Sequence, residues 1–285
     1  MFPYSLYLKK RKEVFDLPKI NGTFLQVHPR IGKFPPPYYN TLEFDRRIFL
    51  ADCAKEGAPY ATDSYEFLSK AEVCRRIGTI DPLKELFFVE SNCAHHLSCF
   101  LSQSAFVRSK KEGEEKTPKH LVVNFDQHSD HGLPFGRFYC GSWGGYVGCD
   151  YFVAGVSKGT EAVLYHCGSG TAEKYRLNDL SAIRAIYDGY EQIYVTVDTD
   201  VLVGGENKRT NWPHGDMTKD ILFLLLNAVP GKKIAAADIT GFPPNIKDED
   251  ERNKSIGKLD SYINDIAETA KVLCDLMDRP LYLSN

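Results

Sequence analysis

The sequence predicts an α/β protein with a mainly parallel central sheet flanked by helices. Short apolar runs alternate with helix-like segments along most of the chain, as in proteins built from βα units. Three of these runs, at residues 86–90, 121–125 and 193–198, end abruptly in acidic or histidine residues. Runs of this kind are typical of buried parallel strands whose carboxyl ends carry ligand-binding groups.

Length, composition and charge limit the classes of function. A chain of 285 residues with 43% hydrophobic residues can form a substantial core, in one large domain or two small ones. A net charge of −3 and a pI near 6.3 argue against nucleic acid or an anionic membrane as the main partner. The first residues form no signal-like apolar region, and no apolar run is long enough to span a membrane. The sequence therefore predicts a soluble, cytoplasmic protein.

The cysteines support the same compartment. None forms a C-x-x-C pair, and most lie in apolar or strand-like segments. This scatter favours reduced, buried thiols over a disulfide framework. The eight positions are Cys53, Cys74, Cys93, Cys99, Cys140, Cys149, Cys167 and Cys274.

The remaining elements follow from apolar periodicity and from glycine and proline positions. Residues 1–60 are predicted to be irregular, and they could form a small β-element or an arm laid over the domain. Pro35, Pro36 and Pro37, at the centre of this segment, cannot lie inside a helix or a central strand. Residues 131–145 are rich in glycine and aromatic residues, which is typical of a substrate rim. Asp216 or Thr218 is expected to cap a helix that ends near Val229. The other expected elements are helices at 63–77, around 97–106, 178–189 and 259–277, strands at 150–156, 161–167 and 233–239, and surface loops at 109–119 and 204–215.

Two acidic motifs carry the chemistry. Asp126, His128 and Asp130 alternate after the strand at 121–125, and alternate residues of an extended segment point the same way. Asp198 and Asp200 repeat the spacing after the strand at 193–198. Converging carboxylates repel one another unless a cation lies between them, and oxygen ligands with some imidazole suit Mn²⁺ or a similar ion.

A third strand end, at 86–90, leads to His95 and His96, and the order of the three motifs resembles the arginase/agmatinase (ureohydrolase) family. The resemblance implies a three-layer arginase-like fold, with one domain over 1–285 whose metal-binding core is 61–285. It implies two Mn²⁺ or similar divalent ions. The implied metal ligands are His96, Asp126, His128, Asp130, Asp198 and Asp200.

The resemblance also implies a division of these ligands and a reaction. Asp126 and Asp198 would bridge the ions, His96 and Asp130 would complete one, and His128 and Asp200 the other. The ions would activate a water that attacks the central carbon of a guanidinium group, giving urea and an amine. Asp130 would orient that water. His131 is a candidate proton shuttle, or else an exposed loop histidine with no role.

Two departures from the family pattern bear on the substrate. Residues 136–145 supply no set of side chains that reads a free amino acid, and Thr240 or Gly241 stands where arginases carry a guanidinium-pairing glutamate. Asp238 and Asp216 are candidate replacements for that acid, with structural roles as the alternative.

These departures favour the divergent peptide arginases, which convert arginine side chains of a ribosomally made peptide to ornithine. Tyr139 and Trp143 would then contact the peptide. The partner would be an arginine-containing peptide or a small guanidino compound, and homo-oligomerisation is left open. Three alternatives remain: a small-molecule ureohydrolase acting on an agmatine-like or arginine-like compound, a metal-dependent deacetylase with a single zinc and a histidine pair, and an inactive binding scaffold.

Overall fold

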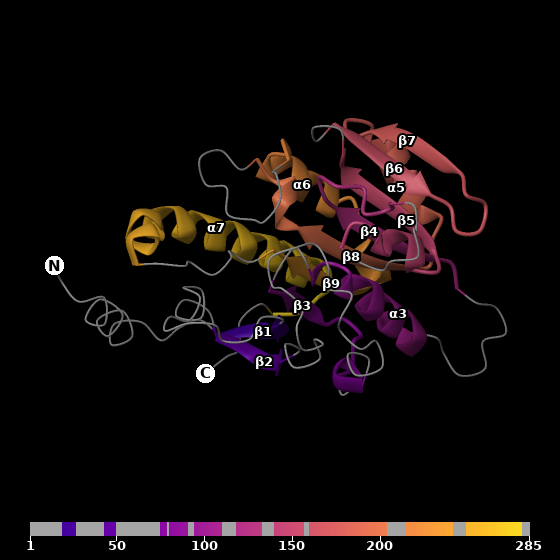
Figure 1. The fold of residues 1–285 in the computed structure, drawn as a ribbon. Coiled ribbons are helices and arrows are strands. Elements are labelled where there is room, and N and C mark those ends of the chain that lie inside the picture. The colour runs from indigo at the N-terminus through magenta and orange to yellow at the C-terminus, as the bar shows by residue number, and fades with distance from the viewer. Residues whose placement is uncertain are drawn as a thin grey trace.

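A computed structural model gives the fold (Figure 1). It describes residues 19–26, 43–49, 75–78, 80–90, 94–109, 118–132, 140–156, 160–203, 215–241 and 249–280.

The described strands form one nine-stranded sheet in the order β2-β1-β3-β9-β8-β4-β5-β6-β7. All neighbouring pairs are parallel except β5–β6 and β6–β7, which are antiparallel. The predicted α/β class with a mainly parallel sheet is therefore confirmed. The strands are β1 (Lys19–Gln26), β2 (Glu43–Phe49), β3 (Leu86–Val89), β4 (His120–Phe125), β5 (Asp150–Gly155), β6 (Glu161–Tyr165), β7 (Ala172–Arg176), β8 (Gln192–Asp198) and β9 (Ile234–Thr240).

Helices cover both faces of the sheet, which gives three layers (Figure 1). Helices α5, α6 and α7 pack on one face, where Ile183, Leu222 and Leu273 join a single apolar cluster with the strands. Helix α3 packs on the opposite face against β8 and β9. The helices are α3 (Leu97–Ser109), α5 (Leu180–Asp188), α6 (Lys219–Leu226) and α7 (Glu249–Leu276).

The central strands explain why a metal site can form at one edge of the sheet. Strand β4 is buried from Leu121 to Phe125, and β8 from Ile193 to Asp198, because both faces are covered. Their parallel register pairs Phe125 with Val197. The residues that follow β4 and end β8 therefore reach the same edge at the same height.

Local sequence sets the ends of two helices. Asp179 caps α5 by accepting a hydrogen bond from the backbone N–H of Ala182, at 3.1 Å. Of the two expected caps of α6, Thr218 takes the position, with its hydroxyl 3.4 Å from the N–H of Ile221. Asp216 lies outside the helix with an exposed side chain.

The structure adds strands that the sequence pattern does not predict. Within residues 1–60, where the sequence leaves a small β-element or an arm open, strands β1 and β2 form a parallel pair that joins the main sheet. Strand β7 is absent from the prediction because its sequence is charged and mostly exposed, without an apolar face. Of the helix expected at 63–77, residues 75–77 are described and are helical. The prolines at 35–37 and most of the loops at 109–119 and 204–215 lie outside the described residues.

Five of the cysteines lie in the described part of the chain: Cys99, Cys140, Cys149, Cys167 and Cys274. All five are free thiols. Cys53, Cys74 and Cys93 lie outside the described residues. Among the described helices, none combines the length and apolar character that crossing a membrane requires.

Candidate metal centre

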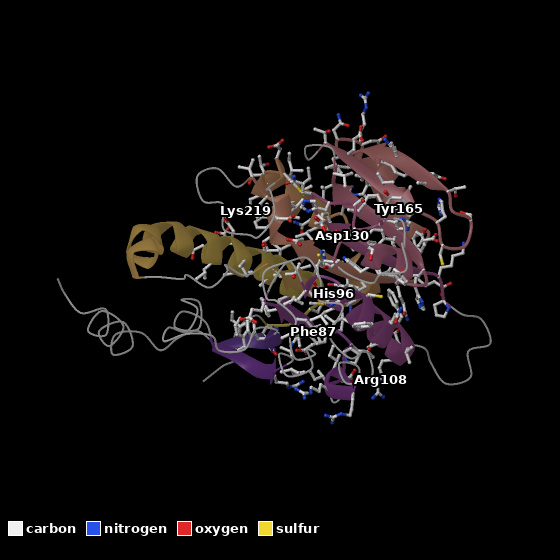
Figure 2. The ribbon with its side chains drawn as sticks, viewed as in Figure 1. Phe87, His96, Arg108, Asp130, Tyr165 and Lys219 are labelled. Carbon is white, nitrogen blue, oxygen red and sulfur yellow. The ribbon has the colours of Figure 1, made fainter. Side chains whose placement is uncertain are left out.

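Side chains from three strand ends meet at the carboxyl edge of the sheet, near the middle of the molecule where Figure 2 labels Asp130. The Nδ1 atom of His95 lies 3.3 Å from Asp126 Oδ2, 3.0 Å from Asp130 Oδ2 and 3.3 Å from Asp198 Oδ2. These four side chains are buried. Three carboxylate oxygens thus face one ring nitrogen.

A second group shares Asp126 with the first. His128 Nδ1 lies 3.4 Å from Asp126 Oδ1 and 3.2 Å from Asp200 Oδ2. Asp126 thus turns one oxygen toward each group, which is the arrangement of a bridging carboxylate. Asp126, Asp130, His128 and Asp200 are divided between the two groups as the resemblance implies. However, His95 takes the place assigned to His96, and the side chain of Asp198, implied as a second bridge, faces the first group.

The spacing of these atoms fits divalent ions. Two ligand atoms about 2.1 Å from an ion and at right angles to each other are about 3.0 Å apart. The separations of 3.0–3.4 Å around His95 and His128 are therefore those of neighbouring ligands on one ion. In addition, Oδ1 of buried Asp200 has no hydrogen-bond donor among the described residues, and Oδ2 faces His128 Nδ1 at 3.2 Å. Buried acceptors of this kind are costly unless a cation satisfies them.

The carboxylates respond to burial and to each other. Burial, reinforced by the charge of Asp126, raises the pKa of Asp130 to about 8. Burial likewise raises the pKa of Asp198, and that of Asp200 well above its usual value. Burial alone would raise the pKa of Asp126, but hydrogen bonds with His128 and His95 hold it well below its ordinary range. Without a cation, the site therefore holds protons in its place.

The pKa values of His95 and His128 are both raised, so the site also favours the positively charged form of its histidines. Burial lowers the pKa of His95, but hydrogen bonds with Asp126, Asp130 and Asp198 outweigh it and hold that pKa well above its usual value. Hydrogen bonds with Asp126 and Asp200 raise the pKa of His128 to about 11.

A buried relay behind His95 fixes the orientation of its ring. The Thr196 hydroxyl donates its proton to Asp238 Oδ1 at 2.7 Å, and it lies 2.9 Å from His95 Nε2. Since the hydroxyl has one proton, it accepts from Nε2–H, and Nδ1 is left to face the carboxylates. Partners of this kind on the far nitrogen are usual for metal-binding histidines. His96 is buried as well, but it belongs to neither of the two described Asp/His groups.

Asp238 therefore has a supporting position. Its side chain is fully buried, and Oδ2 accepts a second hydrogen bond from the Tyr194 hydroxyl at 2.7 Å. Both oxygens are engaged within the sheet, and burial raises the pKa of this carboxyl. These contacts give Asp238 the structural role that is the alternative to pairing with a substrate guanidinium.

Polar residues inside the strands are contributors that sequence reasoning missed. Asn124 Nδ2 donates to Asp126 Oδ2 at 3.1 Å, and it lies 2.7 Å from the Tyr151 hydroxyl. Asn124 precedes Asp126 by two positions, as Thr196 precedes Asp198. A polar residue two before a ligand in a buried strand points the same way as the ligand, and this spacing could have identified both.

The four remaining candidates lie in different surroundings. Trp143 is expected from the sequence to contact a peptide at the substrate rim. It is instead fully buried, and its indole N–H donates to Asp130 Oδ2 at 2.7 Å. His131 is half-buried and stacks on Tyr165 with ring centroids 3.9 Å apart. Asp216 is exposed, and no described contact brings it to the metal centre. Tyr139 lies outside the described residues.

These observations define a class: an α/β fold with a candidate dinuclear metal centre at the carboxyl edge of its sheet. More narrowly, the fold is that of the arginase/agmatinase group. The chain is similar to the arginase of Bacillus caldovelox, with a TM-score of 0.52 at 10% identity over 92% of this chain and 99% of that one. It is similar to an arginase from Medicago truncatula, with a TM-score of 0.52 at 13% identity over 95% of this chain and 91% of that one. It is also similar to a putative agmatinase from Clostridium difficile, with a TM-score of 0.52 at 12% identity over 91% of this chain and 97% of that one. No family model and no curated protein sequence matches the chain.

Proposed function

We propose that this chain is a metal-dependent hydrolase of the ureohydrolase type, which cleaves a C–N bond of a guanidinium group and releases urea. The observation that carries the proposal is the pair of Asp/His groups that share Asp126. The arginase-like fold is consistent with it. The two Asp/His groups together are inferred to hold two divalent ions, Mn²⁺ or similar. The residues that would hold them are His95, Asp126, His128, Asp130, Asp198 and Asp200.

When bound, two such ions supply a nucleophile near neutral pH by lowering the pKa of a water. The chain's own residues then orient the reactants. Asp130 lies within the first group, so its carboxylate is suited to hold the attacking water by a hydrogen bond. Attack on the guanidinium carbon, followed by cleavage of its bond to the alkyl nitrogen, gives urea and an amine that takes up a proton.

We infer that His131 serves proton transfer next to this step. It follows Asp130 directly, and burial lowers its pKa, so the ring is neutral near pH 7 and able to accept a proton. Its stacking on Tyr165 fixes the ring plane.

The acid that pairs with the guanidinium must lie at the same edge of the sheet. Glu90 fulfils this requirement better than Asp238 or Asp216. It directly follows β3, where Val89 pairs with Thr240 of β9, and Thr240 pairs in turn with Asp198. Its side chain is buried, as a charge-pairing acid in a closed site would be. We propose Glu90 for this role.

For the substrate we propose arginine within a peptide. Support comes from the sequence of residues 136–145, which supplies no carboxylate, histidine or asparagine to read free amino and carboxylate groups. Each missing charge-assisted hydrogen bond is worth about 1.5–3 kcal/mol, so the loss of a few of them weakens the binding of free arginine by several powers of ten. A peptide carries no charge at those atoms.

The test is a urea assay with the Mn²⁺-loaded protein on arginine-containing peptides, free arginine and agmatine. We expect turnover of a peptide to exceed that of free arginine by at least 100-fold, and Glu90→Gln to raise KM more than it lowers kcat. Equal turnover of agmatine or free arginine would favour the alternative of a small-molecule ureohydrolase. No urea from any guanidino compound, with acetyl-lysine peptides cleaved instead, would favour the deacetylase.

A further inference from the structure

The end of the glycine-rich segment, from Trp143 onward, lies against the candidate metal centre. It enters a short 3₁₀ turn, Trp143–Tyr146, which packs against helix α3. The Trp143 indole is fully buried, with its ring edge-on to Tyr151 at 5.3 Å and tilted against His95 at 4.9 Å. A large rigid side chain thus lies between the sheet and the metal-facing histidine.

This turn holds Asp130 at two points. The indole Nε1–H donates to Asp130 Oδ2 at 2.7 Å, and the backbone N–H of Gly144 donates to the Asp130 carbonyl at 2.9 Å. Asp130 needs such support because its φ of 45° lies in the left-handed region, which non-glycine residues rarely adopt. Gly144 is required for the close approach, since a Cβ there would lie 2.8 Å from the Tyr151 ring and 3.0 Å from the Asp130 carbonyl oxygen.

We propose that Trp143 is a positioning residue of the metal centre, which sets the affinity of the ion site formed by His95, Asp126 and Asp130. This inference rests on the proposed function. The oxygen that accepts the indole hydrogen bond also faces His95 Nδ1, at 3.0 Å. A carboxylate oxygen has two lone pairs, and the indole N–H occupies one direction, so the other stays aimed at the ion site. Indole nitrogen donates only, so Trp143 orients the ligand without competing for the cation.

The two ion sites should respond differently to loss of this hydrogen bond. The described contacts of Trp143 reach the first site through Asp130 and His95. The second site, formed by Asp126, His128 and Asp200, shares only Asp126 with the first. Replacing a partner that orients a metal ligand typically costs about 10–100-fold in metal affinity. A residue that only packed the core would lower stability and leave both affinities as they were.

The first experiment is calorimetric titration of the metal-free protein with Mn²⁺ alone, for wild type and Trp143→Phe. We expect one of two sites to weaken by about 10–100-fold and the other by less than about threefold. Tyr187→Phe is the matched control, because it changes a fully buried aromatic side chain in the cluster on the opposite face of the sheet from Trp143. Thermal unfolding of each variant establishes that it is folded. Two unchanged sites in folded Trp143→Phe would overturn the proposal.

A second measurement covers the case in which Trp143→Phe does not fold. The sequence has two tryptophans, so Trp212→Phe leaves Trp143 as the only indole emitter. Mn²⁺ is paramagnetic and quenches a nearby indole, whereas Mg²⁺ does not. We expect saturable quenching by Mn²⁺ that Asp130→Asn abolishes, and absence of quenching under full Mn²⁺ occupancy would overturn the proposal. A protein that binds no Mn²⁺ refutes this inference together with the proposed function. One that binds two ions but releases no urea refutes the proposed reaction alone.

Discussion

The two edges of the sheet both carry aspartate and histidine side chains, and they use them in opposite ways. At the carboxyl edge, carboxylates crowd around His95 and His128 without enough donors. At the amino edge, Asp150 accepts hydrogen bonds from the Tyr190 hydroxyl at 2.6 Å and the Cys167 N–H at 2.8 Å, and His166 Nδ1 lies 3.2 Å away.

The difference shows what distinguishes a candidate ion site from a structural cluster. Both oxygens of Asp150 are satisfied by the protein, whereas Oδ1 of buried Asp200 lacks a donor in the described chain. Cavity size does not make this distinction, because a cavity of about 620 Å³ lies over the amino edge, lined by Lys119, Asp150 and Tyr190 among others. The balance of donors and acceptors is the better guide to where a cation belongs.

The largest expected effect separates the two edges directly. Asp126→Ala removes the shared ligand and leaves its neighbours without their common partner, so we expect loss of both ions and of activity. Asp150→Ala should leave metal content unchanged and lower the free energy of unfolding by about 1–3 kcal/mol. Elemental analysis after Mn²⁺ loading and chemical denaturation measure the two quantities. Two ions retained in Asp126→Ala would show that the carboxyl edge is no metal centre.

The relay behind His95 should have a smaller effect on the same edge. Thr196→Val keeps the shape of the side chain but removes the hydroxyl between His95 and Asp238, so we expect about a 10–100-fold loss of Mn²⁺ affinity or activity. Thr196→Ser restores the hydroxyl and should restore most of the function. If the valine variant matches wild type in Mn²⁺ titration, the relay does not position His95.

Asp130 at the carboxyl edge and Asp150 at the amino edge should also change the free energy of unfolding in opposite directions as the pH rises. The pKa of Asp130, raised to about 8 in the folded protein, exceeds its unfolded value of about 4, so its contribution to stability falls as pH rises between them. The raised pKa of His128 acts in the same direction at higher pH. At Asp150, burial is outweighed by hydrogen bonds from Tyr190, Cys167 and His166, which lower its pKa, so its contribution is present above about pH 4 and is lost below.

We therefore expect the Tm of the metal-free protein to fall by several degrees from pH 5 to pH 9, and Mn²⁺ to raise Tm more at pH 9 than at pH 5. Thermal scans in chelator and in Mn²⁺ measure this. Asp130→Asn should flatten the chelator series. A metal-free Tm that is constant or rises over this range would contradict the pKa assignments.

The smallest expected effect concerns the thiols near the amino edge. Cys149 and Cys167 flank Asp150 and His166, and both are free. We expect Tm to be unchanged by reductant, because neither thiol forms a disulfide in the folded protein. A clear loss of stability in reductant would mean that this edge is covalently tied, and the comparison between the edges would need revision.

The sequence carried the centre of the fold and part of the site. Strands β4 and β8 are predicted correctly from their long apolar runs. The acids after them lie in a bend and in a 3₁₀ turn (Thr199–Val201), so turns and not strand alternation bring their side chains together. The resemblance implies His96 as the ligand, whereas His95 is the histidine that faces the carboxylates. Neighbouring residues in a turn point in different directions, and the sequence does not show which of them points into the site. Burial of Trp143 was missed for a related reason: a glycine-rich segment has no periodicity from which a side chain can be assigned to core or rim.

The last strand of the sheet bears on how the molecule behaves among copies of itself. An uncovered edge strand offers free N–H and C=O groups on which another chain can add. Strand β7 ends the sheet on that side, and its Glu173, Lys174 and Arg176 are largely exposed. A second copy pairing there would strip water from these charges. The edge is thus protected by its charge pattern, and replacing these residues with threonine or valine should turn it into a site of aggregation.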